Sequence, residues 1–319
     1  MVHRVLVTRK LPSKVISKLE ESCDVDLYVG DKAISREELL KRVAGKHAIV
    51  CLLTDAIDTA VLDAAGPQLK VVANVAVGYN NIDVAACRAR GIAVTNTPDV
   101  LTESTADLTW ALLLAVARRV AEGDAYVRSG SWPGWTPTQM LGTDVSGKVL
   151  GIVGMGRIGQ AVAHRAAGFK MRVCYHSRTA HVPDRLAAPW ERRGLADLLH
   201  ETDFLSLHVP LTGETRHLIG PEQLALMKPT AFLINTSRGP VVDETALVTA
   251  LLQQRLAGAG LDVFEQEPAI HPGLRTLRQV VLLPHLGSAT LATRVRMGMI
   301  CLENIEAVFG GISPPNQVR

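Results

Sequence analysis

The sequence has no run of apolar residues long enough to cross a membrane. Its longest such stretch, Trp110–Ala117, is closed by two arginines and falls far short of the roughly 20 residues that a membrane-spanning helix needs. We therefore expect a helix of the protein core there. The first residues also lack the apolar segment and small-residue cleavage site of a signal peptide, so we expect a cytoplasmic protein.

The sequence also has no strong net charge and no cysteines at the spacing of a metal site. The formal net charge of the 319 residues is +3, which is too small to indicate a surface for nucleic acid or membranes, although it mildly favours anionic ligands. The five cysteines are scattered singly without a CxxC pair, and none of the ten histidines has partners at the spacing of a metal site. We expect reduced, mostly buried thiols and no metal ion.

Short β-branched runs alternate with stretches of helical period along almost the whole chain. This pattern is typical of parallel sheets joined by crossover helices. It occurs twice, and 319 residues with 47% hydrophobic side chains suit two α/β domains better than one. The expected strands are Arg4–Thr8, Val25–Val29, Ala48–Leu53, Lys70–Val75 and Ile92–Asn96 in the first half, and Val149–Val153, Met171–Tyr175, Phe204–Val209, Ala231–Asn235, Gly258–Val263 and Val280–Leu283 in the second.

The segment between the two halves, residues 101–144, starts with a long apolar helix and ends in a loop rich in Gly, Pro and Trp. Such a segment can act as a hinge and as an arm between subunits. The last helical stretch, Ala289–Phe309, is expected to return to the first half. The predicted domains are therefore residues 1–99 with 287–319, and residues 100–286.

A glycine motif directly follows the strand Val149–Val153 and opens an apolar helix. Gly154 permits a tight turn, Gly156 lets the backbone approach a pyrophosphate, and Gly159 lets the helix pack closely on the strand. The N–H groups at the helix start favour an anion. In this context the motif predicts dinucleotide binding, with Arg157 and Ile158 among the contacts, although a glycine turn without a ligand is the alternative.

The end of the next strand has no acidic residue at the position where an NAD-specific fold holds the ribose hydroxyls. His176, Ser177 and Arg178 stand there instead, and a 2′-phosphate would meet a hydroxyl and a guanidinium. We therefore expect NADP(H), with NAD(H) as the weaker alternative. A solvated basic loop is the structural alternative for these residues.

Three chemically active side chains follow the carboxyl ends of three strands in the second half. Reduction of a 2-keto acid needs a cation for the carboxylate and carbonyl, a proton donor and a hydride source. Arg238, His285 and a nicotinamide fit these roles, and Glu267 would stabilise the imidazolium and orient its ring. Taken singly, each residue also has a purely structural alternative. Arg238 could form a surface ion pair, Glu267 could be a turn residue before Pro268, and His285 could be an ordinary loop histidine.

Five sequence blocks stand out along the chain, namely Gly154–Gly159, Leu207–Thr215, Phe232–Gly239, Gly260–Pro268 and Pro284–Ser288. Together these blocks resemble the D-isomer-specific 2-hydroxyacid dehydrogenases, and they keep that family's order and spacing. The resemblance extends from Val5 to about Phe309. Ser177-Arg178 looks like the NADPH-using glyoxylate and hydroxypyruvate reductase branch of this family.

The resemblance implies two Rossmann-like or flavodoxin-like domains with the active site in the cleft between them. It implies that Arg238 binds the substrate, that Glu267 supports His285 as general acid or base, and that Val77 and Gly78 offer backbone N–H groups to the substrate carboxylate. The further residues implied at the cofactor are Thr105, Val209, Pro210, Thr215, Thr236, Asp262 and Gly287.

The resemblance also implies a homodimer formed through residues 101–144, in which Trp132 or Trp135 could enter the partner's pocket; simple loop packing of these tryptophans is the alternative. The expected function is NADPH-dependent reduction of glyoxylate, hydroxypyruvate or a similar small 2-keto acid to the D-2-hydroxy acid. Alternatives are a nucleotide-sensing regulatory protein of the same fold, a dehydrogenase for a larger 2-hydroxy acid, and formate or phosphite oxidation.

Overall fold

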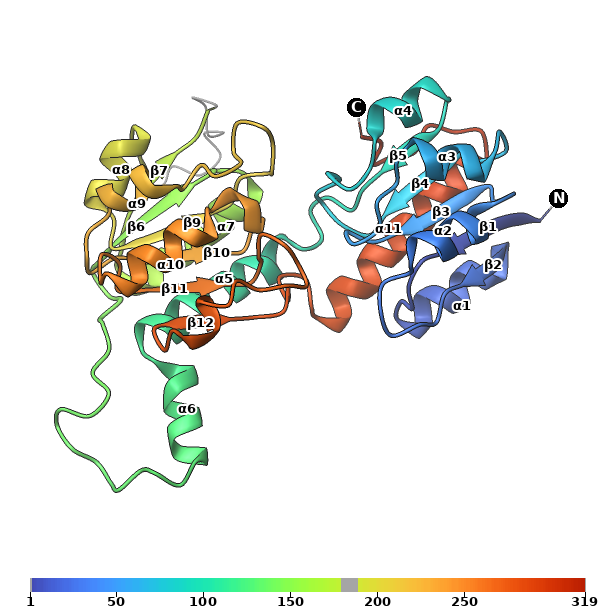
Figure 1. Ribbon diagram of the computed structural model, residues 1–319. Coiled ribbons are helices and arrows are strands. Elements are labelled where there is room, and N and C mark those ends of the chain that lie inside the picture. The colour runs from blue at the N-terminus through green and yellow to red at the C-terminus, as the bar shows by residue number, and fades with distance from the viewer. Residues whose placement is uncertain (1, 179–188, 319) are drawn as a thin grey trace. The chain divides into compact units, whose positions relative to one another are not determined.

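The computed structural model describes residues 2–178 and 189–318 and divides into two compact units (Figure 1). Unit 1 consists of Met1–Leu101 and Ser288–Arg319, and unit 2 of Thr102–Gly287. The chain therefore passes between the units twice.

Unit 1 is built on a sheet of five described strands, all parallel, in the order β2-β1-β3-β4-β5. This is the strand order of flavodoxin-like folds. The strands are β1 (His3–Val7), β2 (Cys23–Leu27), β3 (Ala48–Cys51), β4 (Val71–Asn74) and β5 (Ala93–Thr95).

Helices cover both faces of this sheet, because successive strand residues point to opposite sides. Val5 and Val7 pack with the core under two helices, and Leu6 packs with the core under three others. The first face carries α1 (Ser13–Ser22) and α11 (Leu291–Phe309), and the second carries α2 (Arg36–Val43), α3 (Thr59–Ala65) and α4 (Val84–Ala89). The predicted return of the last helix to the first half is confirmed.

Unit 2 has a parallel sheet of seven described strands in the order β12-β11-β10-β9-β6-β7-β8. Counted from β6, this is the dinucleotide-binding order 3-2-1-4-5-6 with one strand added, and its switch point lies between β6 and β9. The two-residue β8 was not predicted, because so short a strand has no periodicity. The strands are β6 (Val149–Val153), β7 (Arg172–His176), β8 (Glu191–Arg192), β9 (Phe204–Leu207), β10 (Phe232–Asn235), β11 (Gly258–Leu261) and β12 (Val280–Leu282).

The helices of unit 2 also lie on both faces of its sheet, so the prediction of α/β domains with parallel sheets is confirmed. Trp110 of α5 is buried and donates its indole N–H to Val162 O of α7 at 3.0 Å, which makes the apolar stretch of α5 the predicted core helix. One face carries α5 (Thr102–Ala117) and α7 (Arg157–Ala166), and the other carries α8 (Leu195–Glu201), α9 (Pro221–Leu226) and α10 (Glu244–Leu252).

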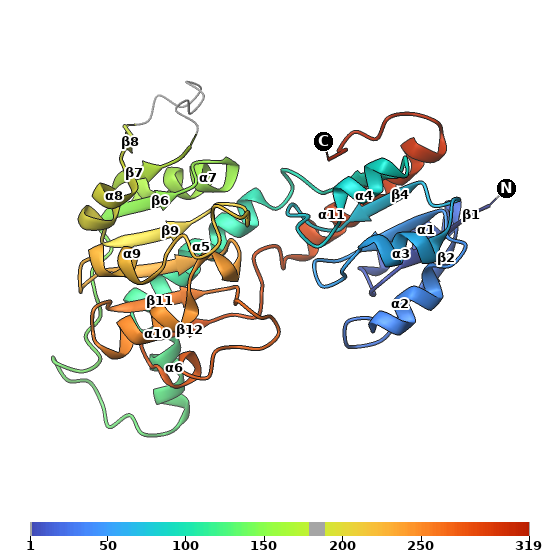
Figure 2. The same ribbon diagram turned by 45° about the horizontal axis from the view of Figure 1, so that its top comes forward.

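An arm made of α6 (Val120–Arg128) and the loop 129–148 extends away from the sheet of unit 2 in both views (Figure 1, Figure 2). None of the residues of α6 is buried. The arm and its base carry large exposed apolar side chains, namely Val120, Val127, Trp132, Trp135 and Leu141.

The cysteines are free thiols, and the described residues hold neither a membrane-length apolar helix nor a cluster of metal-ligating side chains. All five cysteines lie in the described ranges, are buried and form no disulfide. Across residues 2–178 and 189–318, no helix is long and apolar enough to cross a membrane. Over the same ranges, no group of three or more His, Cys, Asp or Glu side chains could hold a metal ion.

Candidate active site

The loops after β10, β11 and β12 carry Arg238, Glu267 and His285. These three strands are neighbours and parallel, with Asn235 beside Leu261 and Leu261 beside Leu282. Their loops therefore leave the sheet at the same edge, which in doubly wound sheets is the edge where ligands bind. All three side chains belong to unit 2.

The imidazole of His285 and the carboxylate of Glu267 form the centre of this group. Nδ1 of His285 lies 2.8 Å from Oε2 of Glu267, and the other carboxylate oxygen accepts the Phe264 N–H at 3.0 Å. Burial acts to raise the pKa of Glu267, but the hydrogen bonds from His285 and Phe264 and the charges of His285 and Arg238 together outweigh it, and the net pKa is lowered. With Nδ1 engaged by an ionised carboxylate, Nε2 is the ring nitrogen that can face a substrate.

Asp262, at the end of β11, holds the loop that carries His285. Its carboxylate accepts the N–H groups of Leu286 at 2.6 Å and Gly287 at 2.8 Å, and its carbonyl accepts the His285 N–H at 2.9 Å. His285 adopts a left-handed backbone with φ of 57°, a conformation that a non-glycine residue keeps only when its surroundings impose it. The hydrogen bonds to Asp262 supply that restraint.

The Arg238 loop is held by a buried asparagine and by close packing. The Asn235 amide donates to Arg238 O at 3.0 Å, and its oxygen accepts the N–H and hydroxyl of Ser237. A Cβ on Gly239 would lie 1.9 Å from the Phe264 carbonyl group, so only glycine lets this loop pack against the loop that leads to Glu267. Burial lowers the pKa of Arg238, and the charge of Glu267 acts against that shift.

The glycine motif adopts the expected strand, turn and helix. Gly154 has φ of 98°, and a Cβ there would lie 2.6 Å from His208 O. A Cβ on Gly159 would lie 2.2 Å from Gly154 O. Gly156 differs, because a Cβ there would meet no protein atom within 4 Å and its φ is an ordinary −77°. Packing does not require glycine at position 156, and the open space beside the first N–H groups of α7 fits the close approach of a pyrophosphate.

Ser177 and Arg178 follow β7 as the sequence indicates, but Arg178 is paired with an acid that the sequence did not reveal. Its Nη1 lies 2.6 Å from Oε2 of Glu214, which comes from the loop after β9. Both side chains are 73% exposed. Strand β6 lies between β7 and β9 in the sheet, so the loops after those two strands meet beside the glycine turn.

The loop after β9, which contains Val209, Pro210 and Thr215, is folded on itself. The Thr215 hydroxyl donates to Pro210 O at 2.6 Å and accepts the Thr212 N–H at 2.8 Å. Just before this loop, burial lowers the pKa of His208 to about 3. Its imidazole is therefore neutral near physiological pH.

Two predicted threonines near the end of the His285 loop, Thr105 and Thr236, are linked through Thr109, whose hydroxyl bonds to both residues. Thr105 of α5 donates its hydroxyl to Gly287 O at 3.0 Å. Thr236 shares a 2.9 Å hydrogen bond with the buried Thr109, whose role the sequence did not indicate. These contacts bring Thr105, Thr236 and Gly287 to the edge of the sheet that carries His285.

Val77 and Gly78 belong to unit 1 and follow the carboxyl end of β4. Both are partly exposed. Among the described residues, no group accepts a hydrogen bond from either backbone N–H. These two donors are therefore available to a ligand or to water.

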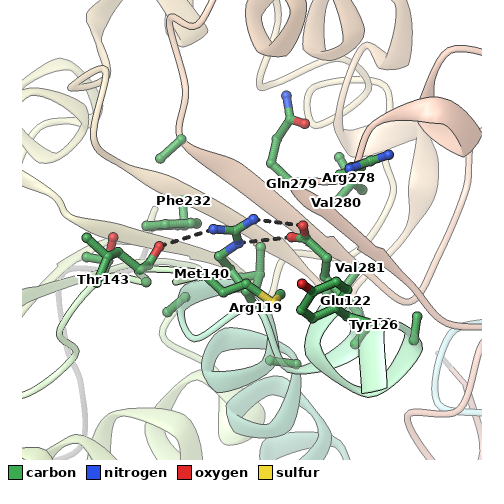
Figure 3. A pocket seen from close by; sticks show the side chains of 18 of the residues that line it. Arg119, Glu122, Tyr126, Met140, Thr143, Phe232, Arg278, Gln279, Val280 and Val281 are labelled. Atoms are coloured by element: carbon green, nitrogen blue, oxygen red, sulfur yellow. Dashed lines mark hydrogen bonds and ion pairs between the residues drawn. The ribbon is translucent and has the colours of Figure 1, made fainter. Parts of the chain in front are cut away.

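A cavity of about 880 Å³ lies at the opposite edge of the unit 2 sheet, where β10 and β12 begin (Figure 3). Its walls come from the end of α5, from α6 and from residues 139–143. Figure 3 shows Arg119 and Glu122 facing each other inside it, and their charged atoms are 2.7 Å apart. Arg238, Glu267 and His285 do not line this cavity, so it is separate from the candidate active site.

Residues 110–287 match the NAD binding domain of the D-isomer specific 2-hydroxyacid dehydrogenases. A protein of Thermococcus onnurineus named glyoxylate reductase is 51% identical over 100% of this chain and 96% of its own length. The crystal structure of a Thermus thermophilus protein has a TM-score of 0.93 and 51% identity, covering 99% of this chain and 100% of that one.

A third similar protein is the NADPH-dependent glyoxylate/hydroxypyruvate reductase of Sinorhizobium meliloti, whose structure was determined with NADP and malonate. It has a TM-score of 0.87 and 34% identity, covering 100% of this chain and 97% of that one. The similarity of sequence and of fold thus extends over the full length of the chain, and the resemblance inferred from the five sequence blocks is confirmed. The chain belongs to the D-isomer specific 2-hydroxyacid dehydrogenase family.

Proposed function

We propose that this enzyme reduces a small 2-keto acid, of the glyoxylate or hydroxypyruvate type, to the D-2-hydroxy acid with NADPH. The observation that carries the proposal is the hydrogen bond of 2.8 Å between His285 and Glu267, at the same sheet edge as the desolvated Arg238. The names of the Thermococcus and Sinorhizobium proteins support the substrate class.

Arg238 is the cation that binds the substrate. Its guanidinium can hold the carboxylate of a 2-keto acid and polarise the neighbouring carbonyl. Because the side chain is largely removed from water, its charge acts more strongly on a bound anion than a solvated arginine would. The N–H groups of Val77 and Gly78 are further donors to the carboxylate.

His285 is the general acid. Bound NADPH supplies the hydride that reduces the carbonyl carbon. Nε2 of His285 gives its proton to the carbonyl oxygen, so that the carbonyl group becomes an alcohol and one proton from solvent is consumed in each turnover. Glu267 keeps Nδ1 protonated, fixes the ring and stabilises the imidazolium. In the reverse direction the neutral imidazole accepts the hydroxyl proton.

The nucleotide is assigned to the glycine turn and the end of β7. The open space at Gly156 and the start of α7 suit the pyrophosphate. Ser177 and Arg178 offer a hydroxyl and a guanidinium to the 2′-phosphate. NADPH is therefore the preferred cofactor in this proposal, and NADH the weaker one.

We further infer that the enzyme is a homodimer formed through the arm. The exposed side chains of α6 and its loop include Val127 and Trp135, which a second copy of the chain would remove from water. The cavity in Figure 3 lies at the base of the same arm, so the partner would cover its opening.

An NADPH-oxidation screen tests the proposed activity, with glyoxylate, hydroxypyruvate, pyruvate, 2-ketogluconate and phenylpyruvate as substrates. We expect turnover with glyoxylate and hydroxypyruvate, and a D-configured product where the product is chiral. His285→Ala should lower kcat by roughly a hundredfold or more and leave the Kd for NADPH unchanged. Failure of the wild-type enzyme to oxidise NADPH with any of the five acids would refute the proposal.

A further inference from the structure

The loop after β4 in unit 1 has three successive carbonyl oxygens that accept hydrogen bonds from the same unit. The donors come from the end of β4 and from the segment after β5. The bonds run to Ala76 O from the Thr97 N–H at 2.9 Å, to Val77 O from Asn96 Nδ2 at 2.8 Å, and to Gly78 O from Asn74 Nδ2 at 2.8 Å.

This arrangement determines where the next N–H groups point. In a trans peptide the carbonyl of one residue and the N–H of the next point in opposite directions, so the N–H groups of Val77, Gly78 and Tyr79 face away from the donors that hold the loop. Among residues 2–178 and 189–318, none of these three N–H groups has a hydrogen-bond acceptor. Successive N–H groups on one side of a loop form an anion-binding concavity.

We propose that Asn74 and Asn96 are positioning residues for the substrate carboxylate, because their amides hold Gly78 O and Val77 O so that the N–H groups of Gly78 and Tyr79 face outward. The inference rests on the proposed function, which assigns a carboxylate to Val77 and Gly78, and it adds the N–H of Tyr79 as a third donor. Neither asparagine touches the substrate in this scheme.

The two amides are themselves fixed as donors toward the loop. Asn74 is fully buried, and its oxygen accepts the thiol of Cys51 at 3.4 Å and an amide hydrogen of Asn81 at 3.5 Å. If the amide of Asn74 were reversed, its oxygen would face Gly78 O, and two acceptors would repel each other.

Asn96 is anchored through the last residues of the chain. Its N–H donates to Asn316 O at 3.3 Å, and Asn316 in turn exchanges two hydrogen bonds with the buried Asn304 of α11. The segment after α11 therefore sets the place from which Asn96 reaches Val77 O. The orientation of the loop depends on contacts far along the sequence.

Three variants of the full-length enzyme test the inference, namely Asn96→Ala, Asn96→Asp and Asn74→Ser. Five quantities are measured: KM and kcat for glyoxylate, the Kd of oxamate with NADPH bound, the Kd of NADPH alone, and Tm. We expect KM and the oxamate Kd to rise about tenfold because charge-assisted hydrogen bonds are misdirected. The kcat should stay within about threefold, and the NADPH Kd should not change.

Asn96→Asp separates orientation from packing, since aspartate has the same size but its carboxylate cannot donate to Val77 O. The matched control is Thr8→Val, which removes a buried hydrogen bond of 2.6 Å to Asp55 in the same unit without touching the three carbonyls. This control should lower Tm and leave KM and the oxamate Kd at wild-type values.

Wild-type KM and oxamate affinity in Asn96→Ala or in Asn96→Asp would overturn the inference. Asn96 is only partly buried, so its variants decide the matter even if Asn74→Ser does not fold. If the wild type reduces glyoxylate and Arg238→Ala abolishes this activity while the Asn96 variants keep their KM, only the positioning role is wrong. If the wild type turns over no 2-keto acid, the proposed function and this inference both fail.

Discussion

Asp262 and His285 are joined through the backbone, since the His285 N–H donates to Asp262 O at 2.9 Å while the Asp262 carboxylate accepts the next two N–H groups of the loop. Burial raises the pKa of Asp262, so only these hydrogen bonds and the nearby imidazole balance the removal of the carboxylate from water. The proton donor of the proposed reaction thus depends on a buried acid for its position.

Asp262→Asn should therefore impair catalysis and folding together. Asparagine has one acceptor oxygen, so either Leu286 or Gly287 would direct its N–H at an NH₂ group. We expect kcat to fall about tenfold to a hundredfold and the free energy of unfolding to fall by about 1–3 kcal/mol. Kinetics and chemical denaturation measure the two effects.

The control for this prediction is Asp203→Asn. Asp203 accepts the Val149 N–H at 2.9 Å and pairs with Lys228, near the start of β6 and away from the catalytic edge. The Asp203→Asn enzyme should be less stable than the wild type and should keep the wild-type kcat. Equal kcat in Asp262→Asn and the wild type would contradict the role given to Asp262.

Glu267→Gln should change the pH dependence of stability and lower the activity. The pKa of Glu267 is lowered in the fold, so its carboxylate stabilises the fold above the ordinary carboxyl pKa, and that contribution is lost as the pH falls through the lowered value. The difference in unfolding free energy between wild type and Glu267→Gln should thus be present at neutral pH and vanish in acid.

In kinetic assays, Glu267→Gln should lower kcat about tenfold to a hundredfold. The amide no longer offers a carboxylate oxygen to Nδ1 of His285, so the imidazole loses the hydrogen bond that orients it. An unchanged kcat would show that Glu267 does not position His285 for the reaction.

Arg178 and Glu214 should have opposite effects on nucleotide preference. Arg178→Ala removes the cation proposed for the 2′-phosphate and should weaken NADPH binding several-fold, with little effect on NADH. Glu214→Gln removes the carboxylate that pairs with Arg178 and should strengthen NADPH binding. Because both side chains are exposed, the effects should shrink at high salt.

Fluorescence titrations with NADPH and NADH, at low and high ionic strength, measure these preferences. Glu21→Gln is the matched control, since it breaks an exposed ion pair with Lys18 on α1 in unit 1 and should change neither Kd. If Arg178→Ala weakens NADH and NADPH equally, the 2′-phosphate assignment is wrong.

Gly156→Ala and Gly159→Ala should separate nucleotide binding from folding. A methyl group at position 156 meets no protein atom within 4 Å, so Tm should stay at the wild-type value while NADPH affinity falls about tenfold or more. At position 159 the methyl group would lie 2.2 Å from Gly154 O, so Tm itself should fall. Unchanged NADPH affinity in Gly156→Ala would show that the pyrophosphate does not bind at this turn.

Val127→Asp should dissociate the proposed homodimer. Val127 lies on α6 and is 55% exposed in the single chain, so a charge there would be buried without a partner in the dimer. Light scattering or sedimentation should show a monomer. The control is Val29→Asp, which changes a side chain that is 71% exposed in unit 1 and should leave the mass of the particle at the wild-type value. If both variants were dimers, α6 would be excluded from the interface.

The sequence determined the features that depend on neighbouring residues. Alternating periods located every described strand except β8, and helical periods located α5, α7 and α11, because side-chain direction repeats along each element. Gly154, Gly156 and Gly159 predicted a nucleotide-binding turn, since their spacing between a strand and a helix is a local pattern. The positions of Arg238, Glu267 and His285 after strand ends were also visible, because parallel strands present their carboxyl ends at one edge.

Which polar groups contact each other depends on the tertiary structure and cannot be predicted from neighbouring residues. The ion pair between Arg178 and Glu214 depends on the position of β6 between β7 and β9. The hydrogen bond from Asn96 to Val77 O depends on the pairing of β4 with β5. Strand order and register are set by long-range packing of whole faces, so no local pattern encodes these partners. For the same reason the resemblance predicted Asp262 at the cofactor, but the sequence did not indicate that Asp262 holds the His285 loop.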